Sequence, residues 1–237
     1  MDLSVVLPIY NEEDVIQATI LEVNSFLKEK NFNFEIIVVD DGSTDDSFKN
    51  VKNLKIPNLV LLQNVKNLGK GKTIKKGMLA AQGELMLFMD ADNSTSINNL
   101  PVFIQQIKEN DTDIVIASRE LPDSVINIHQ PKFKENYGKL GNLLVRLLLL
   151  KEFKDTQCGF KLFKRHCLEL FRKQRLAGWG FDFEILFLAK KYKYQVKELS
   201  VIWTDNPKSE VKFIDYFKTL AELFLVKYNN LTRKYDN

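Results

Sequence analysis

Two acidic clusters follow apolar runs in this sequence. Asp40 and Asp41 come directly after the run 36–39, and Asp90 and Asp92 follow a second run of this kind. Because ligands of an open parallel sheet bind beyond the carboxyl ends of its strands, we expect both clusters to face one crevice. Paired carboxylates repel by about 1 kcal/mol at ~4 Å in water, and a divalent cation removes that repulsion. The clusters therefore predict a site for a nucleotide diphosphate and its metal, one cluster contacting the nucleoside and the other the ion.

The elements that would position these carboxylates alternate along the chain. Apolar runs typical of buried strands are followed by segments whose apolar residues recur at helical spacing. The expected strands cover 3–7, 36–39, 59–62, 85–89, 113–118, 159–163 and a run that ends at 203. This alternation predicts an α/β fold with a mostly parallel sheet flanked by helices. The region 119–160 contains no clear strand, and without a repeat or low-complexity linker we expect a single domain.

Composition limits the classes of function. The 237 residues are 45% hydrophobic, which is enough for the core of a large α/β domain. The net charge, 34 − 31 = +3, is too small to indicate nucleic acid as a partner. Two cysteines and two histidines do not make a cysteine zinc site, and they fit a reducing cytoplasm. We expect no signal peptide, and no membrane span, because the most lipophilic stretch, 143–150, is far shorter than the roughly 20 residues required.

Several motifs resemble those of a known family. The segments 8–13, 40–45, 67–71 and 90–92 are similar in order and spacing to those of family 2 glycosyltransferases of the GT-A fold. In the second half, the segments 155–163, 180–184 and 203–204 resemble dolichyl-phosphate glucosyltransferases and other polyprenyl-phosphate glycosyltransferases. The resemblance implies a Rossmann-like GT-A domain over 1–237, with a nucleotide-binding half (1–118) and an acceptor-binding half (119–237) that carries amphipathic helices. It also implies a hexosyltransferase with UDP-glucose as the favoured donor.

The resemblance implies roles for the residues of the first half. The residues expected to contact the nucleotide are Pro8, Tyr10, Glu12, Asp40, Asp41, Lys70, Asp90 and Ala91. Carboxylates accept hydrogen bonds, which suits the imide N–H of uracil and the ribose hydroxyls. Asp92, with Asp90 beside it, is expected to bind Mg²⁺ or Mn²⁺, and Mg²⁺ usually takes only one or two protein carboxylates. The simpler alternatives are that Tyr10 only covers the sheet and that the Asp-x-Asp pattern lies in a solvated turn.

Four lysines lie at the start of a predicted helix after the turn 67–69. Helix N-termini attract phosphate through their free N–H groups and the helix dipole. We therefore expect Lys70 or Lys72 to touch the diphosphate, and Lys75 and Lys76 to lie on a solvated face.

The acceptor is expected to meet basic residues of the second half. Arg119 follows a strand end and resembles the family arginine that contacts the acceptor phosphate, where its two-pronged geometry can hold two oxygens. Lys161 and Lys208 are weaker candidates for the same anionic pocket. The alternatives are a surface ion pair for Arg119 and plain surface positions for the two lysines.

The acceptor also decides the mechanism. A polyprenyl or dolichyl phosphate has a second pKa near ~6, so its oxygen is already an anion and needs no protein base. The enzyme then aligns that oxygen with the anomeric carbon, and one displacement inverts the anomeric centre. If the acceptor is a sugar hydroxyl, a carboxylate must take its proton, and Asp182 is the candidate by motif. With a phosphate acceptor, Asp182 would instead contact the donor sugar. A catalytically inert sugar-nucleotide-binding module is a further alternative.

A lipid acceptor requires access to a membrane. The leucine-rich stretch 143–147 and a C-terminal aromatic stripe with lysines around it are typical of helices that lie in the headgroup plane. The stripe consists of Phe213, Tyr216, Phe217, Leu220, Phe224 and Leu225. We expect a cytoplasmic protein that is peripheral on the cytoplasmic face of a membrane. Alternatively, both segments pack on the core or on a partner chain such as a membrane protein.

Overall fold

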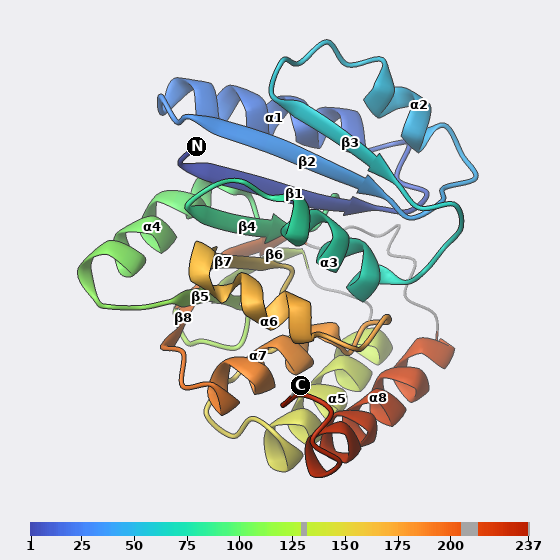
Figure 1. Cartoon of the computed structure of the whole chain (residues 1–237), viewed down its shortest axis with the longest axis vertical. Coiled ribbons are helices and arrows are strands. Elements are labelled where there is room, and N and C mark those ends of the chain that lie inside the picture. The colour runs from blue at the N-terminus through green and yellow to red at the C-terminus, as the bar shows by residue number, and fades with distance from the viewer. Residues whose placement is uncertain (129–131, 205–212, 237) are drawn as a thin grey trace.

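The apolar runs of the sequence form the strands of one seven-stranded sheet (Figure 1). The computed structural model describes residues 1–128, 132–204 and 213–236. The strands are β1 (Leu3–Ile9), β2 (Phe34–Asp40), β3 (Leu59–Gln63), β4 (Leu85–Met89), β5 (Ile114–Ser118), β7 (Phe160–Lys164) and β8 (Val196–Ser200). Their order in the sheet is β3-β2-β1-β4-β7-β5-β8. The predicted α/β fold, with a mostly parallel sheet in a single domain, is confirmed.

The sheet has a topological switch point at β1. This strand pairs in parallel with β2 on one side and with β4 on the other. The chain therefore leaves β1 toward β2 and β3 and then returns to add β4 on the opposite side. Open α/β sheets bind their ligands at such a point, beyond the carboxyl ends of the strands. The exception to the parallel pattern is β7, which lies antiparallel between β4 and β5.

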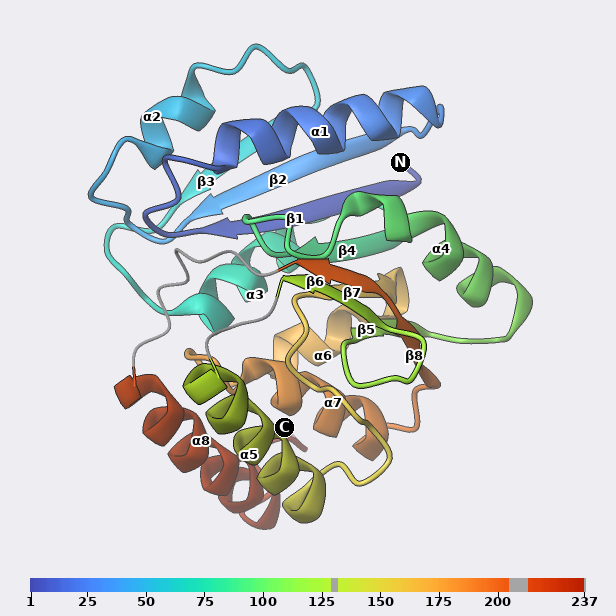
Figure 2. The same cartoon turned by 180° about the vertical axis from the view of Figure 1, so that it is seen from behind.

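Helices cover both faces of the sheet (Figures 1 and 2). They are α1 (Ile16–Glu29), α2 (Ser47–Lys52), α3 (Lys70–Ala80), α4 (Leu100–Glu109), α5 (Lys132–Leu148), α6 (Leu168–Lys173), α7 (Phe181–Lys191) and α8 (Phe213–Leu231). Side chains alternate along each strand, so β1 sends Val6 into one core and Val5 and Leu7 into the other. The first core contains residues of α3, α6 and α7, and the second contains residues of α1 and α4.

A second, two-stranded sheet corrects the prediction for the region 119–160. Here β6 (Val125–Ile128) pairs in parallel with β9 (Ile202–Thr204). The sequence shows no buried apolar run at β6 because most of its residues are exposed. The predicted run ending at Trp203 is likewise two strands, β8 in the main sheet and β9 in the small one.

The last two long helices, α5 and α8, pack against each other. Both begin on the side of the molecule where β1 and β2 end (Figures 1 and 2). Each exposes large apolar side chains, namely Leu143, Leu147, Phe217, Phe224, Leu225, Tyr228 and Leu231. In the part of the chain that the structure describes, no helix combines the length and the apolar character needed to cross a bilayer.

Candidate active site

The two predicted acidic clusters lie at the ends of the two neighbours of β1. Asp40 is the last residue of β2, and Asp90 directly follows β4. Neighbouring strands are ~4.8 Å apart, so the ends of β2 and β4 are separated by about 10 Å, with the end of β1 between them. Both clusters therefore reach the same edge of the sheet, as the sequence predicts.

Asp41 is buried and holds the loop that leads into α3. One of its oxygens, Oδ1, accepts hydrogen bonds from Asn64 Nδ2 (2.8 Å) and from the Leu68 backbone N–H (2.9 Å). Its Oδ2 accepts from the Gly69 N–H (2.9 Å). Both oxygens thus face the protein's own chain. A contact of Asp41 with the nucleotide stays a prediction, and this structural role was missed because its partners lie more than twenty residues away.

Asp40 is also buried, and its carboxylate accepts hydrogen bonds from the Ser43 N–H (3.2 Å) and from Gln63 Nε2 (3.1 Å). At the end of β1, Pro8 is buried, whereas Tyr10 and Glu12 are partly exposed just beyond it. The segments 8–13 and 40–45 therefore lie side by side at the edge of the sheet where ligands are expected.

The two motifs are also bonded to each other. The Asn11 N–H donates to Ser43 Oγ (3.0 Å), and the Thr44 N–H donates back to Asn11 Oδ1 (2.9 Å). In addition, the Glu12 N–H donates to Ser47 Oγ (2.7 Å). The sequence places both motifs in one crevice but contains no local signal for these reciprocal bonds.

Lys70, Asp90, Asp92 and Asp182 form the charged centre of the site. Lys70 Nζ lies 2.6 Å from Asp90 Oδ1. Burial alone would lower the pKa of Lys70, but the charges of the three aspartates outweigh it and raise that pKa. The pKa of Asp92 is raised by burial and by the charge of Asp90. The structure therefore brings together the predicted lysine, the predicted metal ligands and the predicted base.

The chemistry of these residues fits a divalent cation. Asp92 is partly exposed, and its Oδ1 accepts the Ser94 N–H (2.9 Å), which orients the carboxylate. Within 1–128, 132–204 and 213–236, no group of three or more His, Cys, Asp or Glu side chains could hold a metal by itself. Mg²⁺ needs only one or two carboxylates when phosphate oxygens and water complete its shell. Beside them, Ala91 is buried and its carbonyl accepts a hydrogen bond from Thr19 Oγ1 (2.7 Å).

Two N–H groups at the N-terminus of α3 are not free, although the sequence predicts free N–H groups there. The Ala177 carbonyl accepts hydrogen bonds from the N–H groups of Gly71 (2.8 Å) and Lys72 (3.3 Å). These two donors are therefore engaged by a loop about a hundred residues further along the chain. Lys72 is exposed, whereas Lys70 points to Asp90. A phosphate contact of Lys70 or Lys72 stays a prediction, and the Lys70 side chain faces the charged centre.

The solvated face predicted for Lys75 and Lys76 is also wrong. Lys75 Nζ donates to the carbonyls of Arg172 (3.1 Å) and Gln174 (2.7 Å). Lys76 Nζ donates to the carbonyl of Gln63 (2.6 Å). Both ammonium groups tie α3 to neighbouring loops, and no local pattern in the sequence marks those carbonyl partners.

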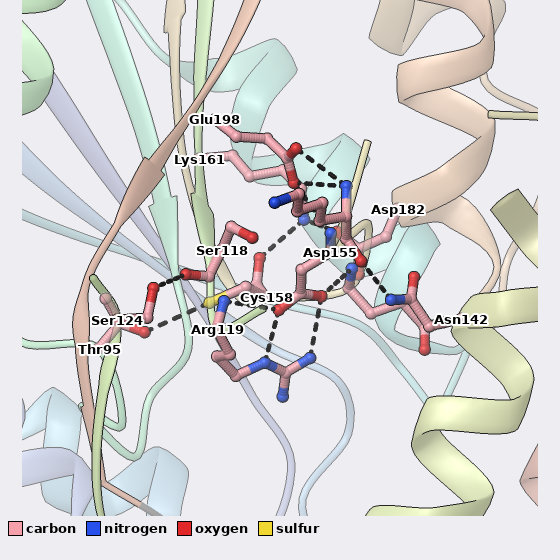
Figure 3. A network of polar contacts seen from close by, with 12 residues as sticks. Thr95, Ser118, Arg119, Ser124, Asn142, Asp155, Cys158, Lys161, Asp182 and Glu198 are labelled. Atoms are coloured by element: carbon pink, nitrogen blue, oxygen red, sulfur yellow. Dashed lines mark hydrogen bonds and ion pairs between the residues drawn. The ribbon is translucent and has the colours of Figure 1, made fainter. Parts of the chain in front are cut away.

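Arg119 lies directly after β5 and faces the carboxylate of Asp155 (Figure 3). Its Nε is 2.7 Å from Asp155 Oδ2, and its Nη2 is 3.1 Å from Oδ1. About a quarter of the arginine side chain is exposed, whereas Asp155 is buried, so this is not the surface ion pair considered as an alternative. Burial would raise the pKa of Asp155, but Arg119 outweighs it and lowers that pKa. Among the described residues, none hydrogen-bonds Nη1 of Arg119. The central carbon of the guanidinium, Cζ, lies 5.5 Å from the centre of the Trp203 ring.

Lys161 is not a surface residue. Its side chain is 1% exposed, and Nζ lies 2.5 Å from Asp182 Oδ1, itself in a side chain that is 3% exposed (Figure 3). Nζ also donates to the Cys158 carbonyl (2.7 Å). The alternative of a plain surface lysine is therefore wrong, and the burial of this ammonium group disfavours the predicted contact with an acceptor phosphate. Lys208 lies outside the described residues.

Asp182 lies in the first turn of α7, and its pKa is raised by burial. It is ion-paired with Lys161, and its charge also contributes to the raised pKa of Lys70. A base that is already paired to a buried ammonium is hindered in taking a further proton. Its role as a general base therefore stays a prediction that the geometry does not favour.

Carboxylates and a lysine at the switch point of an open α/β sheet are typical of proteins that bind nucleotides there. The model of the family described as glycosyl transferase family 2 matches residues 4–171. The chain belongs to this family.

Two relatives and one solved structure resemble the chain. The chain is 34% identical over 235 residues to a dolichyl-phosphate beta-glucosyltransferase of Trichomonas vaginalis, covering 94% of this chain and 72% of the relative. A dolichyl-phosphate beta-glucosyltransferase of Dictyostelium discoideum is 38% identical over 218 residues, with shares of 86% and 66%. The fold matches glucosyl-3-phosphoglycerate synthase from Mycobacterium tuberculosis, crystallised with Mn²⁺, uridine diphosphate and phosphoglyceric acid (TM-score 0.70, 17% identity, shares of 99% and 78%). This likeness confirms the predicted GT-A fold.

Proposed function

We propose that the protein is a metal-dependent, inverting glycosyltransferase that moves a sugar from a nucleotide donor to a polyprenyl or dolichyl phosphate. The observation that carries this proposal is the cluster of Lys70, Asp90, Asp92 and Asp182 at the switch point of the sheet. The two dolichyl-phosphate beta-glucosyltransferases that match most of the chain support the acceptor. The same names support glucose as the sugar, and UDP-glucose is the favoured donor.

In this proposal, one half of the chain binds the donor and the other half binds the acceptor. Residues 1–118 bind the nucleotide, with Tyr10, Glu12 and Asp40 on the nucleoside side. Asp92, with Asp90, would hold Mg²⁺ or Mn²⁺, which neutralises the diphosphate when it is bound. Lys70 adds a fixed positive charge at the same position. The ion pair with Asp90 keeps the Lys70 ammonium group beside the proposed metal ligands.

Residues 119–237 bind the acceptor. Asp155 fixes the plane of the Arg119 guanidinium and leaves Nη1 available for an acceptor phosphate. A phosphate monoester is its own nucleophile, so no carboxylate has to take a proton. This agrees with the pairing of Asp182 to Lys161, which suits a positioning role toward the sugar better than proton transfer.

The proposal places the protein on the cytoplasmic face of a membrane as a peripheral protein. The exposed leucines of α5 and the exposed aromatic residues of α8 provide an apolar surface. The alternative is that a membrane-protein partner covers the same surface.

The decisive experiment is a transfer assay with the purified chain. Labelled nucleotide sugars are offered with Mg²⁺ or Mn²⁺, and with either a polyprenyl phosphate or a soluble sugar as acceptor. We expect a β-linked lipid phosphate sugar, formed from UDP-glucose and abolished by chelator. Transfer only to the sugar hydroxyl would indicate Asp182 as a base. Binding of uridine diphosphate without transfer to either acceptor would indicate an inert binding module.

A further inference from the structure

A loop at residues 174–180, here called the clamp loop, is held by two carboxylates. Glu184 accepts hydrogen bonds from the backbone N–H groups of Arg175 (3.1 Å) and Leu176 (2.9 Å). Glu222 of α8 accepts the N–H groups of two glycines further along the loop, at 178 (3.2 Å) and 180 (2.7 Å). Four amide groups of this short loop are therefore bound by side chains from two different helices.

The other side of the clamp loop holds the first turn of α3. The Ala177 carbonyl accepts the N–H groups of Gly71 and Lys72, and Gln174 Nε2 donates to the Gly71 carbonyl (2.9 Å). The Trp179 ring lies 4.8 Å from Lys70 Nζ. The clamp loop thus contacts both the backbone and the ammonium group of the turn that carries the charged centre.

The packing of the clamp loop leaves little room for another arrangement. A Cβ at Gly178 would lie 2.5 Å from Glu222 Oε1, and a Cβ at Gly69 would lie 2.4 Å from the Ala177 carbonyl oxygen. Cβ atoms essentially never come this close to other atoms, so glycine at both positions allows the loop to approach α8 on one side and α3 on the other.

We propose that Glu222 is a positioning residue that holds Lys70 at Asp90 through the clamp loop. It fixes the amides at 178 and 180, so that the Ala177 carbonyl caps α3 and Trp179 covers the Lys70 ammonium group. A residue of α8, the helix with the exposed aromatic side chains, is thereby connected to the charged centre. The inference rests on the proposed function, in which Lys70 meets the donor diphosphate.

Amide hydrogen exchange of the full chain tests the connection without any ligand. In Glu222→Ala, we expect the amides of Gly71 and Lys72 to exchange about tenfold faster, because their acceptor is no longer fixed. Gly178→Ala, which pushes against the same carboxylate, should have the same effect. Glu169→Ala is the matched control, since Glu169 lies on α6 in an exposed ion pair with Arg172. Unchanged exchange at residues 71 and 72 in both variants would overturn the proposal.

A binding experiment then tests the consequence for the donor site. Calorimetry with uridine diphosphate and Mn²⁺ should show affinity about tenfold weaker in Glu222→Ala. Because Glu222 acts through Lys70, the losses of nucleotide affinity in Glu222→Ala and Lys70→Met should not be additive in the double variant. Additive losses would contradict the positioning role. If the wild-type chain binds no uridine diphosphate, the proposed function fails, while the exchange result still decides whether Glu222 holds α3.

Discussion

Aspartates of the site fall into two groups that sequence position alone does not separate. Asp41 and Asp155 are buried, and their oxygens accept hydrogen bonds from the surrounding chain. Asp92 is partly exposed, and its side chain accepts a bond from one backbone amide at the same turn. A carboxylate that is saturated by its own protein shapes the site, whereas one that keeps oxygens toward solvent can bind a cation.

Asp92→Ala should therefore abolish transfer. The variant loses the carboxylate best placed to hold the metal, and we expect a rate reduction of at least about a hundredfold, as for other losses of electrostatic stabilisation. Initial rates at saturating Mn²⁺ measure this, with circular dichroism to verify the fold. Glu29→Ala, which removes an exposed carboxylate on α1, is the control and should retain full activity. Appreciable transfer by Asp92→Ala would remove Asp92 as the metal ligand.

Asp182→Asn should lower stability more clearly than it lowers activity. The change leaves the Lys161 ammonium group buried without its anion, and breaking a buried pair costs about 3 kcal/mol. Denaturant unfolding measures this loss. Transfer to a lipid phosphate should only weaken, because that acceptor needs no base. Complete loss of transfer, with folding and donor affinity intact, would instead support a hydroxyl acceptor.

The Arg119–Asp155 pair should make stability depend on pH. The pKa of Asp155 is lowered in the folded protein, so its ionised form stabilises the fold above the unfolded value of about 3.9. This contribution is lost as the pH falls through the lowered folded pKa. We expect Asp155→Asn to cost about 3 kcal/mol of unfolding free energy at pH 7. The difference in unfolding free energy between the wild type and Asp155→Asn should shrink steadily below pH ~4. A difference that stays constant would contradict the lowered pKa of Asp155.

At the scale of elements, the sequence predicts the first half of the fold well and its loops poorly. Buried strands such as β2 and β4 have continuous apolar runs, and α1 repeats its apolar residues at helical spacing, so local patterns suffice. In contrast, β6 is mostly exposed, and its pairing partner β9 lies more than seventy residues away. Pairing of this kind depends on tertiary contacts, and the local spacing of apolar residues does not predict them.

In the site, too, local patterns predict some features, whereas others depend on distant partners. The sequence places Asp90, Asp92 and Lys70 correctly at one edge, because each follows or begins an element with a clear pattern. It does not predict the cap on α3, since the Ala177 carbonyl comes from a loop about a hundred residues later. It also does not predict that Lys161 turns inward. In both cases the missing information is the identity of a distant partner.

Gly159 shows how one element constrains the charged centre. This residue directly precedes β7, and its carbonyl accepts the Asp90 N–H (2.9 Å). A Cβ at this position would lie only 1.9 Å from Asp90 Oδ2. Gly159→Ala should therefore displace the Asp90 carboxylate and weaken the Mn²⁺-dependent binding of uridine diphosphate by about tenfold. Gly138→Ala is the matched control, because a Cβ there meets nothing within 4 Å. Equal nucleotide affinity in both variants would contradict this role.

At the scale of the whole molecule, the exposed apolar face lies on the pair α5 and α8, away from α1 (Figures 1 and 2). These two helices begin on the side where the sheet presents its carboxyl ends. Most of the exposed apolar residues lie in the second halves of these helices, so a lipid whose phosphate enters the site from that side would reach this face by running along α5 and α8. The arrangement thus connects two features of the proposal, a charged reaction centre and an apolar support for the acceptor.

The face should therefore bind anionic vesicles, and Phe224→Ser with Tyr228→Ser should weaken that binding. Each ring is just over half exposed, and full burial of such a side chain is worth about 1.5–3 kcal/mol, so burying the exposed parts of both rings is worth about as much in total and the double variant should lose at least about tenfold in vesicle affinity. Co-sedimentation with phosphatidylserine vesicles measures this affinity. Leu21→Ser, at an exposed position on α1, is the control and should bind as the wild type does.

The same variants separate membrane binding from catalysis. If the face serves only to hold the bilayer, the double variant should lose turnover of a long-chain lipid phosphate in vesicles and keep turnover of a short, water-soluble prenyl phosphate. Parallel loss with both acceptors would mean that the two rings support the fold or the site itself. Unchanged vesicle binding would instead assign the face to a partner chain, because so much exposed apolar surface on adjacent helices indicates an interaction site.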